Sequence, residues 1–162
     1  MLLLAVGCGR KAKPSDLPTL YPCEITVIQD EKPLSDALVT IMPLNGDLRF
    51  TIGGKTNAEG KTKPMLDGEW EGVPQGEYLV AISKIITPDL PEPSNETSME
   101  ERIQMRDEKI QQTKQTVAPP FSSLTKSSLR LKIEGKPVTQ SFDIGEAVSI
   151  SLDELNGTPR LP

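Results

Sequence analysis

Alternation of apolar and polar residues is the main structural signal in this chain. It is clearest over 76–84, where Tyr78, Val80 and Ile82 share one face. The opposite face is also largely apolar, which is typical of a strand covered on both sides. Pro74 and Gly76 precede it and favour a turn. We therefore expect a central strand of a β-sandwich here, directly preceded by a tight turn.

Similar patterns predict further strands over 23–28, 37–42, 48–52, 128–134, 138–144 and 147–152. Turn signals separate them, with the strongest at Asn45-Gly46-Asp47 and Asp67-Gly68. We expect Gly53-Gly54 to end the strand over 48–52, and the run over 147–152 to pair at a sheet edge. The pattern as a whole predicts an all-β domain.

An acidic, proline-rich insertion over 87–120 interrupts this pattern. Within it, Ser98-Met99-Glu100-Glu101 matches a capping box and predicts a helix that ends near Gln115. Met99, Ile103 and Ile110 form a thin apolar stripe along this helix. Two interpretations remain open: a partly disordered excursion, or a helix that is presented to a partner.

The amino-acid composition limits the kinds of chemistry and ligand that we expect for this protein. The 162 residues include 15 prolines and 12 glycines, which suits short strands and many turns. The net charge of −5 makes nucleic acid an unfavourable partner. Histidine is absent, which removes His-based acid–base chemistry and most zinc sites. We find no catalytic constellation or calcium-loop spacing, and we expect a non-enzymatic protein without cofactor or metal.

The amino terminus, an apolar run that leads to Gly7-Cys8, resembles the lipobox of a bacterial lipoprotein signal peptide. In such proteins the cysteine, here Cys8, carries a diacylglycerol, whose two chains suffice for stable membrane anchoring. The charged n-region is missing and the apolar run is short, so we expect 1–7 to be a signal-peptide remnant. Residues 8–21 would be the lipid anchor and tether. The alternative is an unmodified Cys8 that pairs with Cys23.

Three motifs carry a family resemblance: 31–34 (Glu-Lys-Pro-Leu), 56–60 (Thr-Asn-Ala-Glu-Gly) and 73–78 (Val-Pro-Gln-Gly-Glu-Tyr). In order and spacing they resemble the carboxypeptidase-regulatory-like, or transthyretin-like, domain of small planctomycete-type lipoproteins. Glu31 stands where that family usually has glycine, and Asn57 where it usually has aspartate. The resemblance implies a seven-stranded prealbumin-like sandwich over 22–152 with no enzymatic activity. The remaining residues, 153–162, we expect to form a flexible tail.

Two functions follow from these expectations. The first is a cell-envelope lipoprotein with a structural or protein-interaction domain, held by membrane lipid through Cys8. The second is a module at the cell surface that binds a carbohydrate or peptide, with Trp70, the single tryptophan, as a ligand contact. Exposure of Trp70 beside a concave patch would favour the second, and burial would favour the first. Cys23 alternates with Ile25 and Val27, so we expect it to be a buried, unreactive thiol.

Overall fold

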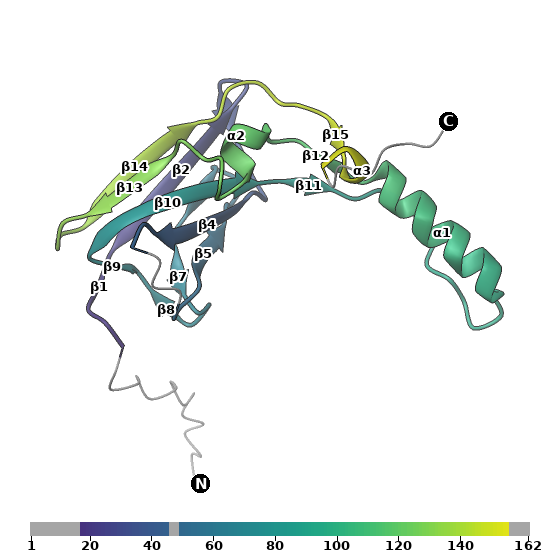
Figure 1. Cartoon of the computed structure of the whole chain (residues 1–162), viewed down its shortest axis with the longest axis horizontal. Helices are drawn as coiled ribbons and strands as arrows, with labels where there is room; N and C mark the ends of the chain where they lie inside the picture. Colours follow the sequence, from purple (N-terminus) through teal and green to yellow (C-terminus); the bar gives the residue numbers. More distant parts are fainter. Residues whose placement is uncertain (1–16, 46–48, 156–162) are drawn as a thin grey trace, which may run out of the picture.

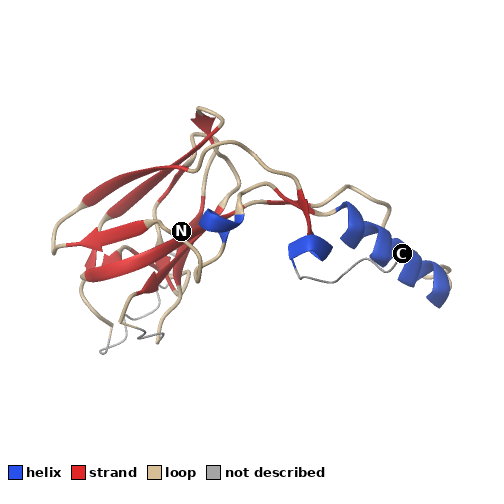
Figure 2. Ribbon diagram, turned by 45° about the horizontal axis from the view of Figure 1, so that its top comes forward, coloured by secondary structure: helices blue, strands red, loops and turns tan. Residues whose placement is uncertain are grey.

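Two β-sheets face each other across one hydrophobic core, and a helical arm projects from one end (Figures 1 and 2). This computed structural model describes residues 17–45 and 49–155. The larger sheet is antiparallel and has the order β13-β10-β4-β5-β7-β8. Its strands are β13 Arg130–Ile133, β10 Gly76–Ser83, β4 Leu38–Pro43, β5 Ile52–Lys55, β7 Met65–Leu66 and β8 Trp70–Glu71.

The second sheet is built around β2, which pairs with β14, β3 and β6. These strands are β2 Cys23–Gln29, β14 Val138–Asp143, β3 Lys32–Pro33 and β6 Lys61–Thr62. The pairing of β14 with β2 is parallel, although β13 and β14 follow each other in the chain. The chain therefore crosses from one layer to the other between them. The all-β fold class is confirmed, whereas the seven-stranded transthyretin-like arrangement stays a prediction.

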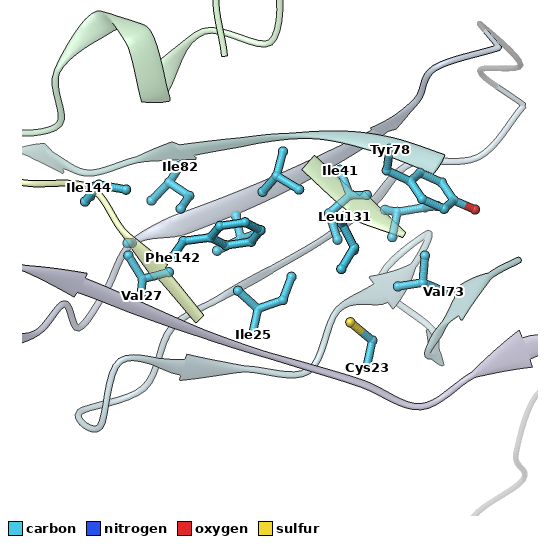
Figure 3. Packing of buried hydrophobic residues seen from close by; sticks show 14 of the residues in the cluster. Cys23, Ile25, Val27, Ile41, Val73, Tyr78, Ile82, Leu131, Phe142 and Ile144 are labelled. Carbon is cyan, nitrogen blue, oxygen red and sulfur yellow. The ribbon is translucent and has the colours of Figure 1, made fainter. Parts of the chain in front are cut away.

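The core lies between the two sheets, as Figure 3 shows for Ile25 and Val27 of β2 opposite Ile82 of β10. These three side chains are fully buried, which confirms the alternation that predicted their strands. Complete burial of one such side chain contributes about 1.5–3 kcal/mol. The buried cluster comprises Cys23, Ile25, Val27, Leu34, Ala37, Val39, Ile41, Ile52, Leu66, Val73, Tyr78, Val80, Ile82, Val117, Leu131, Ile133, Phe142 and Ile144.

Strand β5 differs from its prediction. It runs over Ile52–Lys55, so Gly53 and Gly54 lie inside the strand that they were expected to end. A Cβ on Gly53 would overlap the backbone oxygen of Val39, and one on Gly54 would overlap the hydroxyl of Thr62. Glycine within a strand often marks such a close approach. The predicted strand over 48–52 is therefore wrong, and 46–48 lie outside the described residues.

Turns and side-chain hydrogen bonds join the first two sequence motifs. The β2–β3 turn places Asp30 and Glu31 at φ of 52° and 61°, a region that favours glycine. Buried Thr56 donates its hydroxyl proton to the carbonyl oxygen of Leu34 (2.6 Å) and accepts from the N–H of Ala37 (2.9 Å). Residues far apart in sequence thereby fix the turns on one side of the sandwich.

The sandwich extends into the segment assigned to the tether. Leu20–Tyr21 form β1, which pairs with β9 Val73–Pro74, and Leu17 also packs against the core. Apolar contacts hold these residues, which is why the predicted boundary at 22 comes too late. Cys8 and residues 1–16 as a whole lie outside the described residues.

The arm comprises residues 85–115 together with 150–155. Its base is a small sheet of order β11-β12-β15, formed by Ile85–Ile86, Lys114–Gln115 and Ile150–Ser151. Helix α1, Met99–Gln112, extends from this base, and α3, Leu152–Leu155, follows β15. The short helix α2, Pro119–Ser122, returns the chain to the sandwich beside β10.

Three predictions about these segments can be compared with the structure. Helix α1 ends at Gln112 instead of near Gln115, because Thr113 caps it and β12 begins at the next residue. Of the run over 147–152, only Ile150–Ser151 form a strand, β15, which pairs with β12 at the edge of the small sheet of the arm, as expected for an edge strand. Helix α3 also reaches into the segment from 153 onward that was assigned to a flexible tail.

Candidate functional site

The predicted capping box sets the start of α1. The hydroxyl of Ser98 accepts from the N–H of Glu101 (3.2 Å), and the carboxylate of Glu101 accepts from the N–H of Ser98 (2.9 Å). The hydrogen bond from the Ser98 backbone lowers the pKa of Glu101. A Ser–Glu pair of this kind satisfies two amide groups that no helical turn can satisfy. The expected helix start is confirmed.

One side of α1 is covered by the segment that precedes it. Arg102 donates from Nε to the carbonyl oxygen of Thr97 (3.0 Å) and from Nη2 to that of Ser94. Lys109 pairs with Glu92 across 2.8 Å, and this contact lowers the pKa of Glu92. The basic side of the helix is therefore already engaged within the arm.

The neighbouring side of α1 carries an uncovered apolar stripe. Met99, Ile103 and Ile110 are 74%, 44% and 40% exposed, and no residue of α1 is buried. Spacings of four and seven residues place them on one face of the helix. Six of the eight exposed large hydrophobic residues in the described ranges belong to the arm: Ile85, Ile86, Met99, Ile103, Ile110 and Leu155. The arm is therefore the main exposed apolar surface of the described chain.

A hollow of about 320 Å³ lies over β4 and β5, where Gly53 and Gly54 have no side chains. It adjoins a second hollow of about 480 Å³, and both are lined by Gly54, Lys55 and Met65. We call the two together the trough. The trough is lined by Glu24, Leu38, Val39, Thr40, Thr51, Ile52, Gly53, Gly54, Lys55, Asn57, Glu59, Lys61, Thr62, Lys63, Met65 and Gly68.

Three lysines line the trough, and each of them pairs with a carboxylate. Lys55 pairs with Asp36 at 2.8 Å, whose pKa is lowered by this contact. Lys61 and Lys63 each have a carboxylate at 3.8 Å, from Glu24 and Glu71 respectively. All three lysine side chains remain 45–65% exposed. Exposed pairs of this kind contribute about 0–1 kcal/mol, so the lysines can turn to an incoming carboxylate at little cost.

A smaller hollow of about 150 Å³ lies between Phe50 and Tyr78. Tyr78 donates its hydroxyl proton to the carbonyl oxygen of Pro74 (2.8 Å), and burial raises its pKa. Small-molecule sites usually begin at about 300 Å³. This hollow is therefore part of the sandwich packing, and Tyr78 has a structural role in it.

The residues singled out from sequence lie apart from the trough. Trp70, on edge strand β8, is half-buried against the core and lines neither the trough nor the smaller hollow. Its role as a ligand contact stays a prediction. Cys23 is a free, buried thiol, and desolvation raises its pKa to about 11. The expected burial of this thiol is confirmed, and because the thiolate is the reactive form, its low reactivity stays a prediction. Cys8 lies outside the described residues.

Within residues 17–45 and 49–155, no three side chains of the His, Cys, Asp and Glu types come together as metal ligands. None of the helices in this part of the chain has both the length and the apolar character needed to cross a bilayer.

Sequence reasoning missed the trough. Gly53-Gly54 was expected to end a strand, and the lysines at 55, 61 and 63 form no recognisable motif in the sequence. Only the pairing of β5 with β4 and of β6 with β2 brings these residues together. A pair of glycines followed by three lysines within ten residues is the local signal that would have suggested it.

Comparison with known proteins does not assign this chain to a family. No family model matches the chain, and no curated protein matches it. A crystal structure of the major pilin subunit of Bacillus cereus is similar at 15% identity with a TM-score of 0.44. The match covers 78% of this chain and 30% of the pilin chain. Similarity of this degree is too low to carry an argument about fold or function.

Proposed function

We propose that this protein is a non-enzymatic cell-envelope lipoprotein whose β-sandwich is a scaffold for a docking arm. The observation that carries the proposal is the contrast between a fully buried core and an arm helix that buries no residue. Exposed apolar surface in one place on a protein is typical of an interaction site. The half-burial of Trp70 against the core favours this role over glycan or peptide binding.

The arrangement of the two ends supports an anchored role. Strand β1, near the start of the described chain, lies at the end of the sandwich away from the arm (Figure 1). An acyl group on Cys8 would attach the molecule on the β1 side. The arm would then point away from the membrane, toward other envelope components.

We further propose that the sandwich is of the transthyretin-like type. The three motifs that resemble this family occur in the expected order. Two of them meet in space, because Thr56 of the second motif bonds to Leu34 of the first. The third motif provides Pro74, the acceptor for the hydroxyl of buried Tyr78.

The anchor is tested by the intact mass of the full-length gene product made in a bacterial host. We expect a diacylglycerol on Cys8 and loss of residues 1–7, and an inhibitor of the lipoprotein signal peptidase should abolish the loss of residues 1–7. The Cys8→Ser variant is the control and should stay unmodified. An uncleaved parent chain with a free Cys8 thiol would overturn the anchored role.

A further inference from the structure

We propose that the free edge of β14 binds an extended segment of a partner protein, which joins the second sheet as an additional antiparallel strand. The inference adds a second interaction surface to the proposed docking role of the arm. It rests on the proposed function at one step, which is the choice of a partner segment over a second copy of this chain.

One side of β14 is paired and the other is free. Its neighbour among the described residues is β2, and β14 is the outermost strand of that sheet. Val138 donates its N–H to the carbonyl oxygen of Pro22 (3.0 Å), and Ile144, directly after the strand, donates to that of Ile28 (3.0 Å). Backbone groups of successive residues point to alternate sides of a strand. The even-numbered residues of β14 therefore bond to β2.

The odd-numbered residues of β14 direct their backbone groups to the free edge. They are Thr139, Ser141 and Asp143, and their side chains are exposed. The carbonyl oxygen of Ser141 accepts from the side-chain amide of Gln140 (3.2 Å) and keeps a second lone pair. In an antiparallel ladder, each opposed pair of such residues exchanges two hydrogen bonds. An extended backbone is the ligand that matches this row of donors and acceptors.

Strand β14 also lacks the protection that the other sheet edges have. Proteins commonly protect an edge by keeping it short or by placing lysine or proline on it. Strands β6 and β8 have two residues each, β3 consists of Lys32 and Pro33, and β13 has four residues that include Arg130 and Lys132. Strand β14 has six residues, no proline and no charge before Asp143. An edge of this kind is a template for strand addition.

The side chains of β14 indicate the chemistry of the segment that fits beside it. Val138, half-buried, and Phe142, buried, lie on the face toward the core. Thr139 and Ser141 lie on the opposite, exposed face. Cross-strand neighbours stabilise a sheet when apolar residues face apolar residues and when like charges are kept apart. We therefore infer a segment that alternates apolar and polar residues, lacks proline and has no carboxylate opposite Asp143.

The direction of β14 favours a partner segment over a second copy. Val138 pairs with Cys23 near β1, and the chain continues from the other end of β14 toward the arm (Figure 1). Two copies paired antiparallel through β14 would therefore hold their arms and their β1 ends at opposite ends of the dimer. Copies anchored in one membrane would point their arms in the same direction, which this pairing does not allow.

The first test measures amide hydrogen exchange by NMR in the full chain. It uses Cys8→Ser as the parent, so that acylation has no influence. We expect slow exchange at the even-numbered positions of β14 and exchange at least about a hundredfold faster at the odd-numbered positions. Equal protection along the strand would overturn the inference, because the edge would then already be covered.

The second test uses a phage-displayed library of random eight-residue peptides as the probe. Selection on the parent should enrich alternating peptides without proline. Ser141→Pro removes an N–H that points away from β2, and we expect it to weaken binding of an enriched peptide at least about tenfold. Ser141→Ala is the matched control, since it keeps this N–H and should bind like the parent. Ser141→Lys keeps the backbone intact and should also weaken binding, because lysine protects an edge.

Bound peptide should slow amide exchange at the odd-numbered positions of β14. Peptides that bind the Ser141→Pro and Ser141→Lys chains as tightly as the parent would overturn the inference, as would a selection that enriches none. Self-association of the parent that Ser141→Pro abolishes would assign the edge to a second copy and overturn the choice of partner. These measurements use the unacylated chain, so failure of strand addition is distinguishable from failure of the anchor.

Discussion

The sandwich and the arm use apolar residues in opposite ways. In the sandwich, residues such as Ile25 and Val80 alternate along strands and are fully buried between two sheets. In α1, Ile103 and Ile110 repeat at helical spacing and stay exposed. The same physical driving force therefore stabilises the fold in one region and is left available for association in the other. Substitutions in the sandwich should therefore change the free energy of unfolding strongly, whereas substitutions in the arm should change it little.

The largest expected difference comes from matched truncations. Ile25→Ala removes a fully buried side chain, and we expect it to lower the free energy of unfolding by about 2–5 kcal/mol. Ile103→Ala in the exposed stripe should change it by no more than about 0.5 kcal/mol. Urea unfolding followed by the fluorescence of Trp70 measures both. Equal losses would show that the arm is part of the same cooperative core.

A single added methyl group tests how tightly the sandwich backbone is packed. In Gly53→Ala the new Cβ would overlap the backbone oxygen of Val39, and we expect a loss of about 1–3 kcal/mol. Gly68→Ala is the control, since its φ of +69° is strained for alanine but no atom lies within 4 Å. That control should cost about 1 kcal/mol. A loss for Gly53→Ala no larger than that of the control would show that the sheet shifts at little cost to accept the new methyl group.

Loss of the capping box should affect the arm alone. We expect Ser98→Ala to destabilise α1 by about 1 kcal/mol, because the N–H of Glu101 loses the Ser98 hydroxyl as its acceptor. Amide hydrogen exchange should quicken in 99–112 and stay unchanged in β2 and β10. Ser94→Ala, which leaves the capping box intact, is the control. A matching drop in the protection of β10 would contradict the separation of the two regions.

Replacement of Glu31 by glycine should stabilise the sandwich slightly. Glu31 has a φ of 61° in the β2–β3 turn, where a side chain is strained and glycine is not. The relief of backbone strain is partly offset by the greater conformational entropy of glycine in the unfolded chain. We therefore expect the free energy of unfolding to rise by about 0.5 kcal/mol. Urea unfolding measures it, with Glu59→Gly as a control. A loss of stability on Glu31→Gly would mean that this side chain makes contacts that outweigh the strain.

The smallest effect should be a pH dependence of the arm. Folding lowers the pKa values of Glu92 and Glu101 below the usual 4.5. Their stabilisation of the arm is therefore present above pH 4.5 and is lost as pH falls through the lowered values. The helical circular dichroism signal should decrease there, and less so in a Glu92→Gln, Glu101→Gln double variant. An identical acid response in that variant would assign the loss to other carboxylates.

Local patterns predicted the elements that need only local information. The alternation of Ile25 and Val27 located β2, and that of Tyr78, Val80 and Ile82 located β10. Ser98 and Glu101 located the start of α1, because a cap depends on residues three positions apart. The apolar stripe on α1 was also visible from spacing. Spacing did not show whether other parts of the molecule would cover this stripe, since that depends on which surfaces lie nearby in the fold.

The trough and the base of the arm could not be predicted in this way. The trough needs β5 beside β4 and β6 beside β2, and the base of the arm needs β15 beside β12. Two-residue strands such as β12 and β15 have too few positions for alternation to be recognised. The glycines in β5 removed the apolar signal from a strand that the sheet nevertheless contains.

The sequence by itself therefore determined an all-β body, its principal strands, its turns and a capped helix, because each depends on neighbours within a few residues. The tertiary structure alone decided the parallel pairing of β14 with β2, the glycine-lined trough and the exposure of the arm. These features arise when surfaces far apart in the chain meet. The free energy of such contacts depends on the shape and charge of both partners, which a pattern along one segment does not contain.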